Sequence, residues 1–153
     1  MPREVQVAQR RRGVEVAPAS VLRVVRALDR RRGPRCPAGT LSVAFVGDRE
    51  IARLHAEFLD DPSVTDVLTC PGEPHPGEPF AGEICINVDQ ARRAAREHGH
   101  ALSAELRLYL VHGWLHLAGF DDGTRREVAA MRAAESSALS ALERAGLRLR
   151  VKE

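Results

Sequence analysis

One short segment, residues 111–122 with the sequence VHGWLHLAGFDD, constrains this chain more than any other. His112 and His116 lie four residues apart, so in a helix both imidazoles project from one face and can share a cation. Gly119 follows, where a helix can end on a left-handed residue that glycine adopts without steric cost. The chain can then turn back and deliver Asp122. The segment therefore predicts a helix that ends beside a metal site of His112, His116 and Asp122.

This donor set indicates zinc, with one ion per chain. Two neutral imidazoles and one carboxylate occupy three corners of a tetrahedron and leave the fourth for water, as in catalytic zinc sites. The spacing H-x-x-x-H-x-x-G-x-x-D is that of the metzincin peptidases, with Asp as third ligand and with Gly113 where those enzymes carry the general base Glu. The competing interpretation is a pair of core histidines without a metal. Asp121 is the alternative third ligand, but the spacing favours Asp122 and leaves Asp121 to orient a histidine.

The bulk composition is that of a soluble globular protein. A chain of 153 residues with 44% hydrophobic and 29% charged residues can bury a sizeable core as one domain, residues 1–153. The first residues lack the apolar stretch of a secretory signal, and no apolar run approaches the length of a membrane span. We therefore expect a cytoplasmic protein without membrane contact. Cys36, Cys70 and Cys85 show no C-x-x-C spacing, so neither a disulfide framework nor a thiolate zinc site is predicted.

Hydrophobic periodicity predicts an α+β fold. The segment 102–117 is apolar around nearly its whole circumference, which is typical of a central buried helix. We expect a small mixed sheet of three to four strands, packed with about five helices around that helix. The predicted strands are short segments near 5–7 and 14–16, then 40–46, 64–70 and 82–88; the predicted helices are 18–32, 48–59, 89–99, 102–117 and 123–146; a loop covers 71–79, and 147–151 is an edge strand or a frayed tail.

Positive charge is concentrated in residues 10–35, which contain nine arginines and only two acidic residues. This basic segment is therefore where the protein would contact a polyanion. A competing explanation is GC-rich coding, because 22 of the 23 basic residues of the chain are arginine.

The segment 111–122 closely resembles the H-G-x-L-H-L-x-G-[YF]-D-H signature of the YbeY family, the bacterial endoribonucleases of rRNA maturation. Asp122 stands where the family has its final His. Residues 65–69, TDVLT, resemble the family's T-D-V-L-S segment, and residues 82–86, GEICI, resemble its G-D-I-x-I strand. The order and spacing of these motifs agree from about residue 41 to the end of the last predicted helix.

This resemblance implies a single-strand-specific endoribonuclease in which a zinc-activated water attacks the phosphodiester. It implies that RNA, the ribosome or ribosomal proteins are partners, and that Thr65, Asp66 and the basic segment hold the RNA strand. Leu59 stands where the family has an arginine near the phosphate backbone, and Arg53, one turn earlier, is the predicted replacement. A carboxylate at position 122 adds a negative charge, which would leave a bound water less acidic.

Two other functions remain open at this point. A metzincin-like peptidase would need a base that Gly113 cannot provide, and Glu83 or Glu105 would have to approach the water instead. The missing arginine and histidine also allow a ribosome-associated factor that binds metal without catalysis. Cleavage of RNA but not of casein would separate the nuclease from the peptidase.

Overall fold

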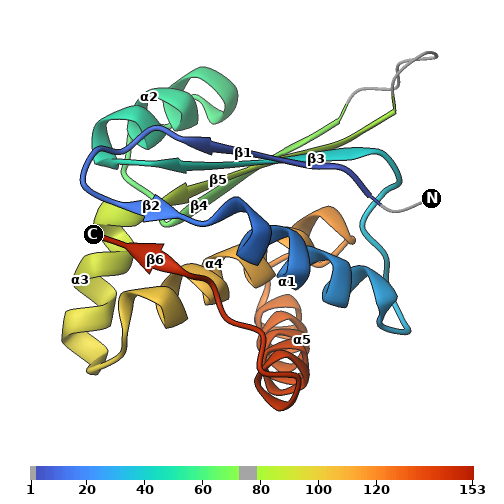
Figure 1. Cartoon of the computed structure of the whole chain (residues 1–153). Coiled ribbons are helices and arrows are strands. Elements are labelled where there is room, and N and C mark those ends of the chain that lie inside the picture. The colour runs from blue at the N-terminus through green and yellow to red at the C-terminus, as the bar shows by residue number, and fades with distance from the viewer. Residues whose placement is uncertain (1–2, 73–78) are drawn as a thin grey trace.

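The structure is a computed structural model, and it describes residues 3–72 and 79–153. A four-stranded mixed sheet forms one layer, and helices cover both of its faces (Figure 1). The described elements follow the chain as β1 (Val5–Gln9), β2 (Glu15–Val16), α1 (Pro18–Arg30), β3 (Thr40–Val46), α2 (Asp48–Leu59), β4 (Val67–Pro71), β5 (Phe80–Asn87), α3 (Val88–His98), α4 (Leu102–Leu117), α5 (Arg125–Arg144) and β6 (Val151–Lys152).

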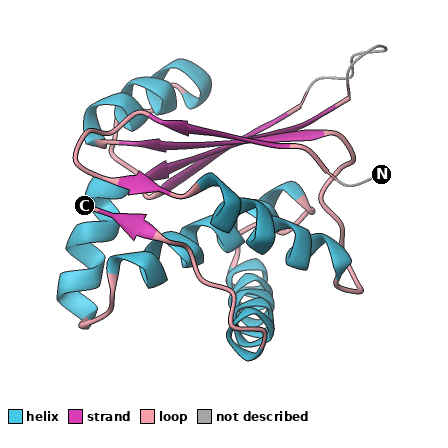
Figure 2. Cartoon of the chain, in the orientation of Figure 1, coloured by secondary structure: helices cyan, strands magenta, loops and turns pink. Residues whose placement is uncertain are grey.

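The strands lie in the order β1-β3-β5-β4. β1, β3 and β5 are parallel, with Val7 beside Val43 and Val43 beside Ile84, and β4 closes the sheet antiparallel to β5. A second, two-stranded sheet joins β2 to β6, with Val16 opposite Val151 (Figure 2). The predicted α+β class, with about five helices and three to four strands in a mixed sheet, is confirmed for the described residues.

Two apolar clusters hold the layers together. The larger cluster lies between the sheet and the helices α1, α4 and α5, and includes Phe45, Ile84, Leu110 and Met131. The smaller one lies under α2 on the opposite face of the sheet, where Ile51 packs on residues of β3, β4 and β5. Helix α4 is the central helix that the sequence predicts, because residues from all sides of it are buried.

Most predicted boundaries agree with the structure to within two residues, but one strand begins later than expected. β4 starts at Val67 rather than at residue 64. The backbone carbonyl of Thr65 accepts a hydrogen bond from the Asn87 side chain, and the Asp66 carboxylate accepts one from Val67 N. Residues 64–66 are therefore held as a loop.

The tail is an edge strand rather than frayed, because β6 pairs with β2. Most of the predicted loop 71–79 falls on residues 73–78, outside the described part. No helix among the described residues combines the length and the apolar character that a membrane crossing requires.

Candidate metal centre

Helix α4 lies unusually close to the sheet at Gly113. A Cβ atom at this position would be 2.5 Å from Ile84 Cγ2, a side-chain atom of β5. Since Ile84 is fully buried, it has no space into which it could retreat. Glycine is thus required by packing at the position where metzincins carry their catalytic glutamate, and no larger side chain fits there.

The end of α4 returns the chain toward the two histidines. Gly119 N donates to His116 O over 3.1 Å, and Phe120 N donates to Leu115 O over 3.0 Å. Gly119 has a φ of 107°, which favours glycine. The chain then begins α5 through a capping box, in which Thr124 and Glu127 satisfy each other's backbone amides. Asp121 and Asp122 lie in the short segment between these two fixed points.

Three ligand atoms converge as the sequence predicts. The Nε2 atoms of His112 and His116 each lie 3.6 Å from Asp122 Oδ2. One ligand atom from each of the three residues lies within 4.8 Å of the other two. The two imidazole rings meet edge to face, with centroids 4.7 Å apart.

This donor set fits a zinc-class ion. In a tetrahedral site with zinc–ligand bonds of about 2.0–2.1 Å, neighbouring donor atoms are about 3.3 Å apart. The two measured nitrogen–oxygen separations of 3.6 Å lie close to that value. Two imidazole nitrogens and a carboxylate oxygen are also the ligands that zinc accepts in catalytic sites.

Each histidine has a carboxylate on its other ring nitrogen. His112 Nδ1 hydrogen-bonds Glu135 Oε2 of α5, and His116 Nδ1 lies 3.9 Å from Asp121 Oδ1. A proton held at Nδ1 leaves the Nε2 lone pair available as a ligand. Asp121 thus lies where an orienting residue is expected, while Asp122 is the carboxylate that reaches both Nε2 atoms.

Sequence reasoning missed Glu135. It lies 23 residues after His112, and no motif connects the two positions. One signal was present: Met131, Ala138 and Leu142 are buried on α5 at helical spacing, and Glu135 falls on the same side of that helix. A carboxylate on an apolar helix face indicates a buried polar partner.

The surroundings of the histidines are strongly negative. Burial alone would lower the pKa of His112, but its hydrogen bond to Glu135 and the charges of Glu135, Asp66 and Asp122 together raise this pKa above its ordinary value. Such a field attracts a cation. It would repel the phosphates of RNA unless a cation offsets it.

Thr65 and Asp66 are held near the two histidines by Asn87. This fully buried side chain donates to Thr65 O over 3.0 Å, and its backbone N–H donates to Asp66 O over 2.8 Å. The same residue caps α3, since its Oδ1 accepts hydrogen bonds from Asp89 N and Gln90 N. The charge of Asp66 acts on His112, so this loop borders the metal centre.

Arg53 does not join this group. It lies on α2, which packs on the sheet face opposite α4 (Figure 1). Its guanidinium is exposed and pairs with Glu50 at 3.8 Å and with Glu57 at 3.6 Å on the same helix.

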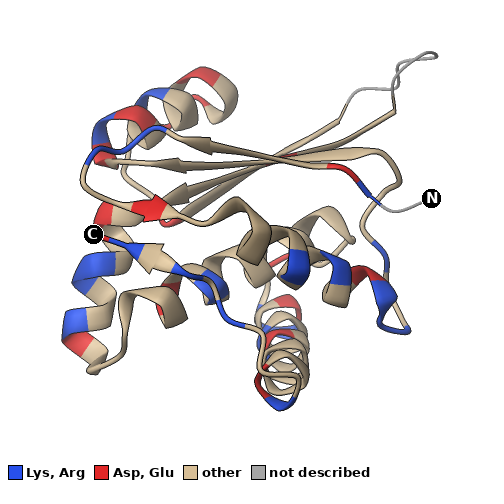
Figure 3. Ribbon diagram, viewed as in Figure 1, with Lys and Arg blue, Asp and Glu red and all other residues tan. Residues whose placement is uncertain are grey.

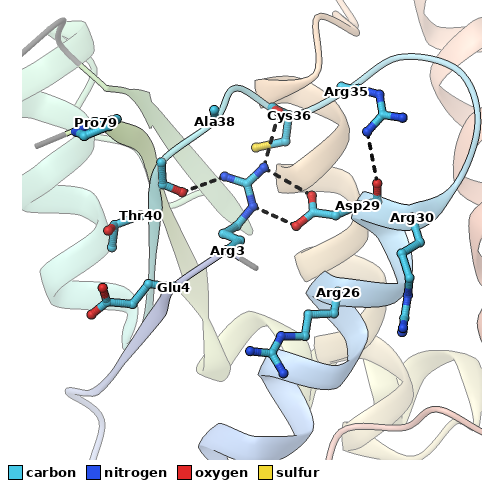
Figure 4. Close-up of a pocket in the computed structure, with 11 residues that line it drawn as sticks. Arg3, Glu4, Arg26, Asp29, Arg30, Arg35, Cys36, Ala38, Thr40 and Pro79 are labelled. Atoms are coloured by element: carbon cyan, nitrogen blue, oxygen red, sulfur yellow. Dashed lines mark hydrogen bonds and ion pairs between the residues drawn. The ribbon is translucent and has the colours of Figure 1, made fainter. Parts of the chain in front are cut away.

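The basic segment is spread over two regions (Figure 3), along the β1–β2 connection and along α1 with the loop after it. A cavity of about 860 Å³ opens beside α1 (Figure 4). Arg26 and Arg30 line it from α1, and Arg35 from the following loop. Arg3 spans its wall, donating to Asp29 over 2.7 Å and to three carbonyl groups, those of Cys36, Pro37 and Gly39. All the donors of Arg3 are therefore used within the protein.

Two other arginines of this segment lie beside the end of α4. Arg31 and Arg32 line a smaller cavity, of about 180 Å³, together with Trp114 and Phe120. Phe120 directly precedes Asp121. Arg31 donates to Ser137 over 2.8 Å, whereas Arg32 is exposed and forms no ion pair within residues 3–72 and 79–153.

Comparison with known proteins identifies one family. A family model described as "Endoribonuclease YbeY" matches residues 8–143. A relative of that name from Nautilia profundicola is 40% identical over 84 residues, which cover 55% of this chain and 60% of the relative. One from Carboxydothermus hydrogenoformans is 35% identical over 105 residues, covering 69% of this chain and 73% of the relative.

The chain spans only part of the length of several other relatives, for example 43% of one from an Anaeromyxobacter species and 35% of one from Myxococcus xanthus. Among solved structures, the solution structure of a Thermotoga maritima protein superposes with a TM-score of 0.61 at 22% identity. The match covers 90% of this chain and 88% of that protein, so it shows that the fold is shared.

Proposed function

This chain belongs to the YbeY family of endoribonucleases, and on that premise we propose that it is a zinc-dependent endoribonuclease that cuts single-stranded RNA during rRNA maturation. The observation that carries the proposal is the convergence of His112, His116 and Asp122 in a negative field. Family membership supports the reaction type, and on the same basis we propose rRNA and the ribosome or its proteins as partners and the cytoplasm as the site of action.

The residues of the metal centre have separate tasks in this proposal. His112, His116 and Asp122 would hold one zinc ion, which when bound supplies Lewis acidity toward a phosphoryl oxygen and lowers the pKa of a water molecule. Glu135 holds the Nδ1 proton of His112, and Asp121 faces Nδ1 of His116. These carboxylates keep both Nε2 atoms directed at the same point.

Asp66 and Thr65 suit contact with ribose rather than with phosphate. A carboxylate repels phosphate, but it accepts a hydrogen bond from a 2′-hydroxyl, the group that distinguishes RNA from DNA. Asp66 Oδ1 is already occupied by Val67 N at 2.8 Å and by the Thr65 hydroxyl at 3.4 Å. Its second oxygen, Oδ2, forms no hydrogen bond with the described residues, and Asp66 as a whole is exposed.

Three observations weigh against a peptidase. The contact between Gly113 and Ile84 leaves no room for the missing glutamate. Glu83, one proposed substitute, bonds Ser42 and Cys85 on the α2 face of the sheet. Glu105, the other, faces His100 near the start of α4.

The test compares the zinc-loaded protein with a His112→Ala variant on single-stranded RNA, duplex RNA, single-stranded DNA and casein. We expect the wild type to cut single-stranded RNA alone, and we expect the variant to lose both the zinc bound at this centre and cleavage while its thermal melt stays cooperative. Cleavage of casein but not of RNA would support a peptidase instead. A His112→Ala variant that lacks zinc at this centre and still supports rRNA processing in cells would identify a ribosome-associated binding factor.

A further inference from the structure

The turn between α3 and α4 carries a second cluster of metal-ligand side chains. It consists of His98, His100 and Glu105, and one ligand atom of each lies within 4.8 Å of the other two. His100 Nε2 is 3.8 Å from Glu105 Oε1, and the rings of His98 and His100 have centroids 5.7 Å apart. None of the three residues belongs to the metal centre described above.

The backbone of this turn holds the three side chains in place. His98 is the last residue of α3, and Gly99 follows with a φ of 69°, which reverses the chain. His100 N donates to Ala95 O over 2.9 Å, and Glu105 lies in the first turn of α4. All three residues therefore sit on hydrogen-bonded backbone rather than on a free loop.

Glu105 is the unusual member of the cluster. Its side chain is only 6% exposed, and within residues 3–72 and 79–153 its ion pair is with His100 alone. Tyr109, one turn later, lies against this carboxylate; burial and the charge of Glu105 raise the pKa of Tyr109, which therefore stays neutral. A buried carboxylate costs free energy unless a cation compensates it. An imidazole that is half exposed compensates it only when protonated.

We propose that His98, His100 and Glu105 form a second binding site, for a divalent transition-metal ion of the zinc class. Two nitrogen donors and one carboxylate oxygen suit such an ion better than calcium or magnesium, which prefer oxygen ligands alone. The imidazoles reach it from the solvent side, and the carboxylate forms the buried wall. The ion would replace the single contact between His100 and Glu105 with three bonds, and it would tie the end of α3 to the start of α4.

This site is distinct from the proposed catalytic one. Glu105 and His112 are seven residues apart on one helix, which is about 10 Å along its axis. Two ions that act on one phosphate lie about 3.5–4 Å apart. The second ion therefore stabilises the helix that carries the metal centre, and it takes no part in the chemistry.

The test measures zinc bound by the full chain after removal of metal, by equilibrium dialysis and calorimetric titration. We expect two equivalents for the wild type, one for the His98→Ala/His100→Ala variant, one for the His112→Ala/His116→Ala variant and none for the quadruple variant. His55→Ala is the matched control, because it removes a histidine that pairs with Asp61 and Ser63 and should keep both equivalents.

A thermal melt isolates the new site from the catalytic one. In the His112→Ala/His116→Ala background, zinc should raise Tm, and adding His98→Ala/His100→Ala should abolish that rise. The histidines are chosen because both are exposed, so their removal should leave the fold intact without metal. A His112→Ala/His116→Ala variant that binds no zinc, or a His98→Ala/His100→Ala variant that binds as much zinc as the wild type, overturns the proposal. RNA cleavage plays no part in this readout, so the two proposals fail separately.

Discussion

At the scale of single residues, Glu135 is the side chain on which the metal centre depends without being a ligand. It accepts a hydrogen bond from His112 Nδ1 and is itself mostly buried, with 16% of its side chain exposed. The imidazole is thereby fixed in the tautomer whose Nε2 faces Asp122.

We therefore predict that Glu135→Gln weakens zinc binding at the metal centre by about 10–100-fold. The neutral amide lacks the negative charge by which the Glu135 carboxylate makes the His112 imidazole a stronger donor to the ion. The affinity is read by competition with a chromogenic chelator, in the His98→Ala/His100→Ala background so that one site is observed. Glu143→Gln on the same helix is the control, since Glu143 pairs with Arg107 and Arg148. Equal affinities for Glu135→Gln and Glu143→Gln would mean that the Glu135 contact does not support the ligand.

Local spacing explains which residues of the centre could be predicted. His112, His116 and Asp122 fall within eleven positions, so helix geometry and a helix-ending glycine were enough to bring them together. Glu135 arrives from another helix, through the packing of α5 on α4. The spacing of residues within one helix does not predict which residue of a second helix will face it.

At the scale of elements, the junction of β5 with α2 and α3 positions the loop that borders the metal centre. Asn87 donates to Asp48 Oδ1 over 2.8 Å, and Arg93 donates to both oxygens of the same carboxylate over 2.8 Å. The hydrogen bond from Arg93 is the main cause that lowers the pKa of Asp48 below its ordinary value.

We predict that this junction makes stability depend on acid. Since the folded-state pKa of Asp48 lies below the unfolded one, its stabilisation is complete above the unfolded pKa of about 4 and is lost as pH falls through the folded pKa. Asp48→Asn should thus lower the free energy of unfolding by about 1 kcal/mol near neutral pH, a modest value because the pair is partly exposed. That difference should shrink steadily in acid.

Urea unfolding of the wild type, Asp48→Asn, Arg93→Gln and the double variant measures this coupling at several pH values. A coupling energy that stays constant from neutral to strongly acidic pH would contradict the assignment to Asp48.

Elements were predicted well where one face of a segment is buried, as in α1 and β3, because burial imposes a period on the sequence. The pairing of β2 with β6 was not predicted. It joins residues about 135 positions apart, and each strand is two residues long, which is too short to carry a period. The late start of β4 likewise follows from Asn87, a residue of another strand.

At the scale of the whole molecule, the sheet separates two sets of arginines. Arg53 lies on the α2 side, while Arg32 lies beside Phe120 on the side of the metal centre. Arg53 was predicted to lie near the substrate only because it precedes position 59 by about one helical turn. A period of 3.6 residues identifies a helix, but it does not state which face of a sheet that helix covers.

We accordingly predict that Arg32→Ala, and not Arg53→Ala, weakens binding of single-stranded RNA. The loss of one phosphate contact should reduce the slope of log K against log salt by about 0.7. Fluorescence anisotropy with a labelled oligonucleotide over a range of salt concentrations measures this slope. The opposite result, an effect of Arg53→Ala alone, would restore the assignment made from the sequence.

The contact between Gly113 and Ile84 also limits how this fold can diverge. A descendant that acquired a glutamate at position 113 would first have to lose the branched side chain at position 84, and that loss leaves a void in the core. A glutamate at position 113 clashes as long as Ile84 is present, and the smaller side chain at position 84 destabilises the core by itself, so each single step lowers stability. Epistasis between one helix position and one strand position is enough to keep a lineage of this fold from becoming a metzincin-like protease by single steps.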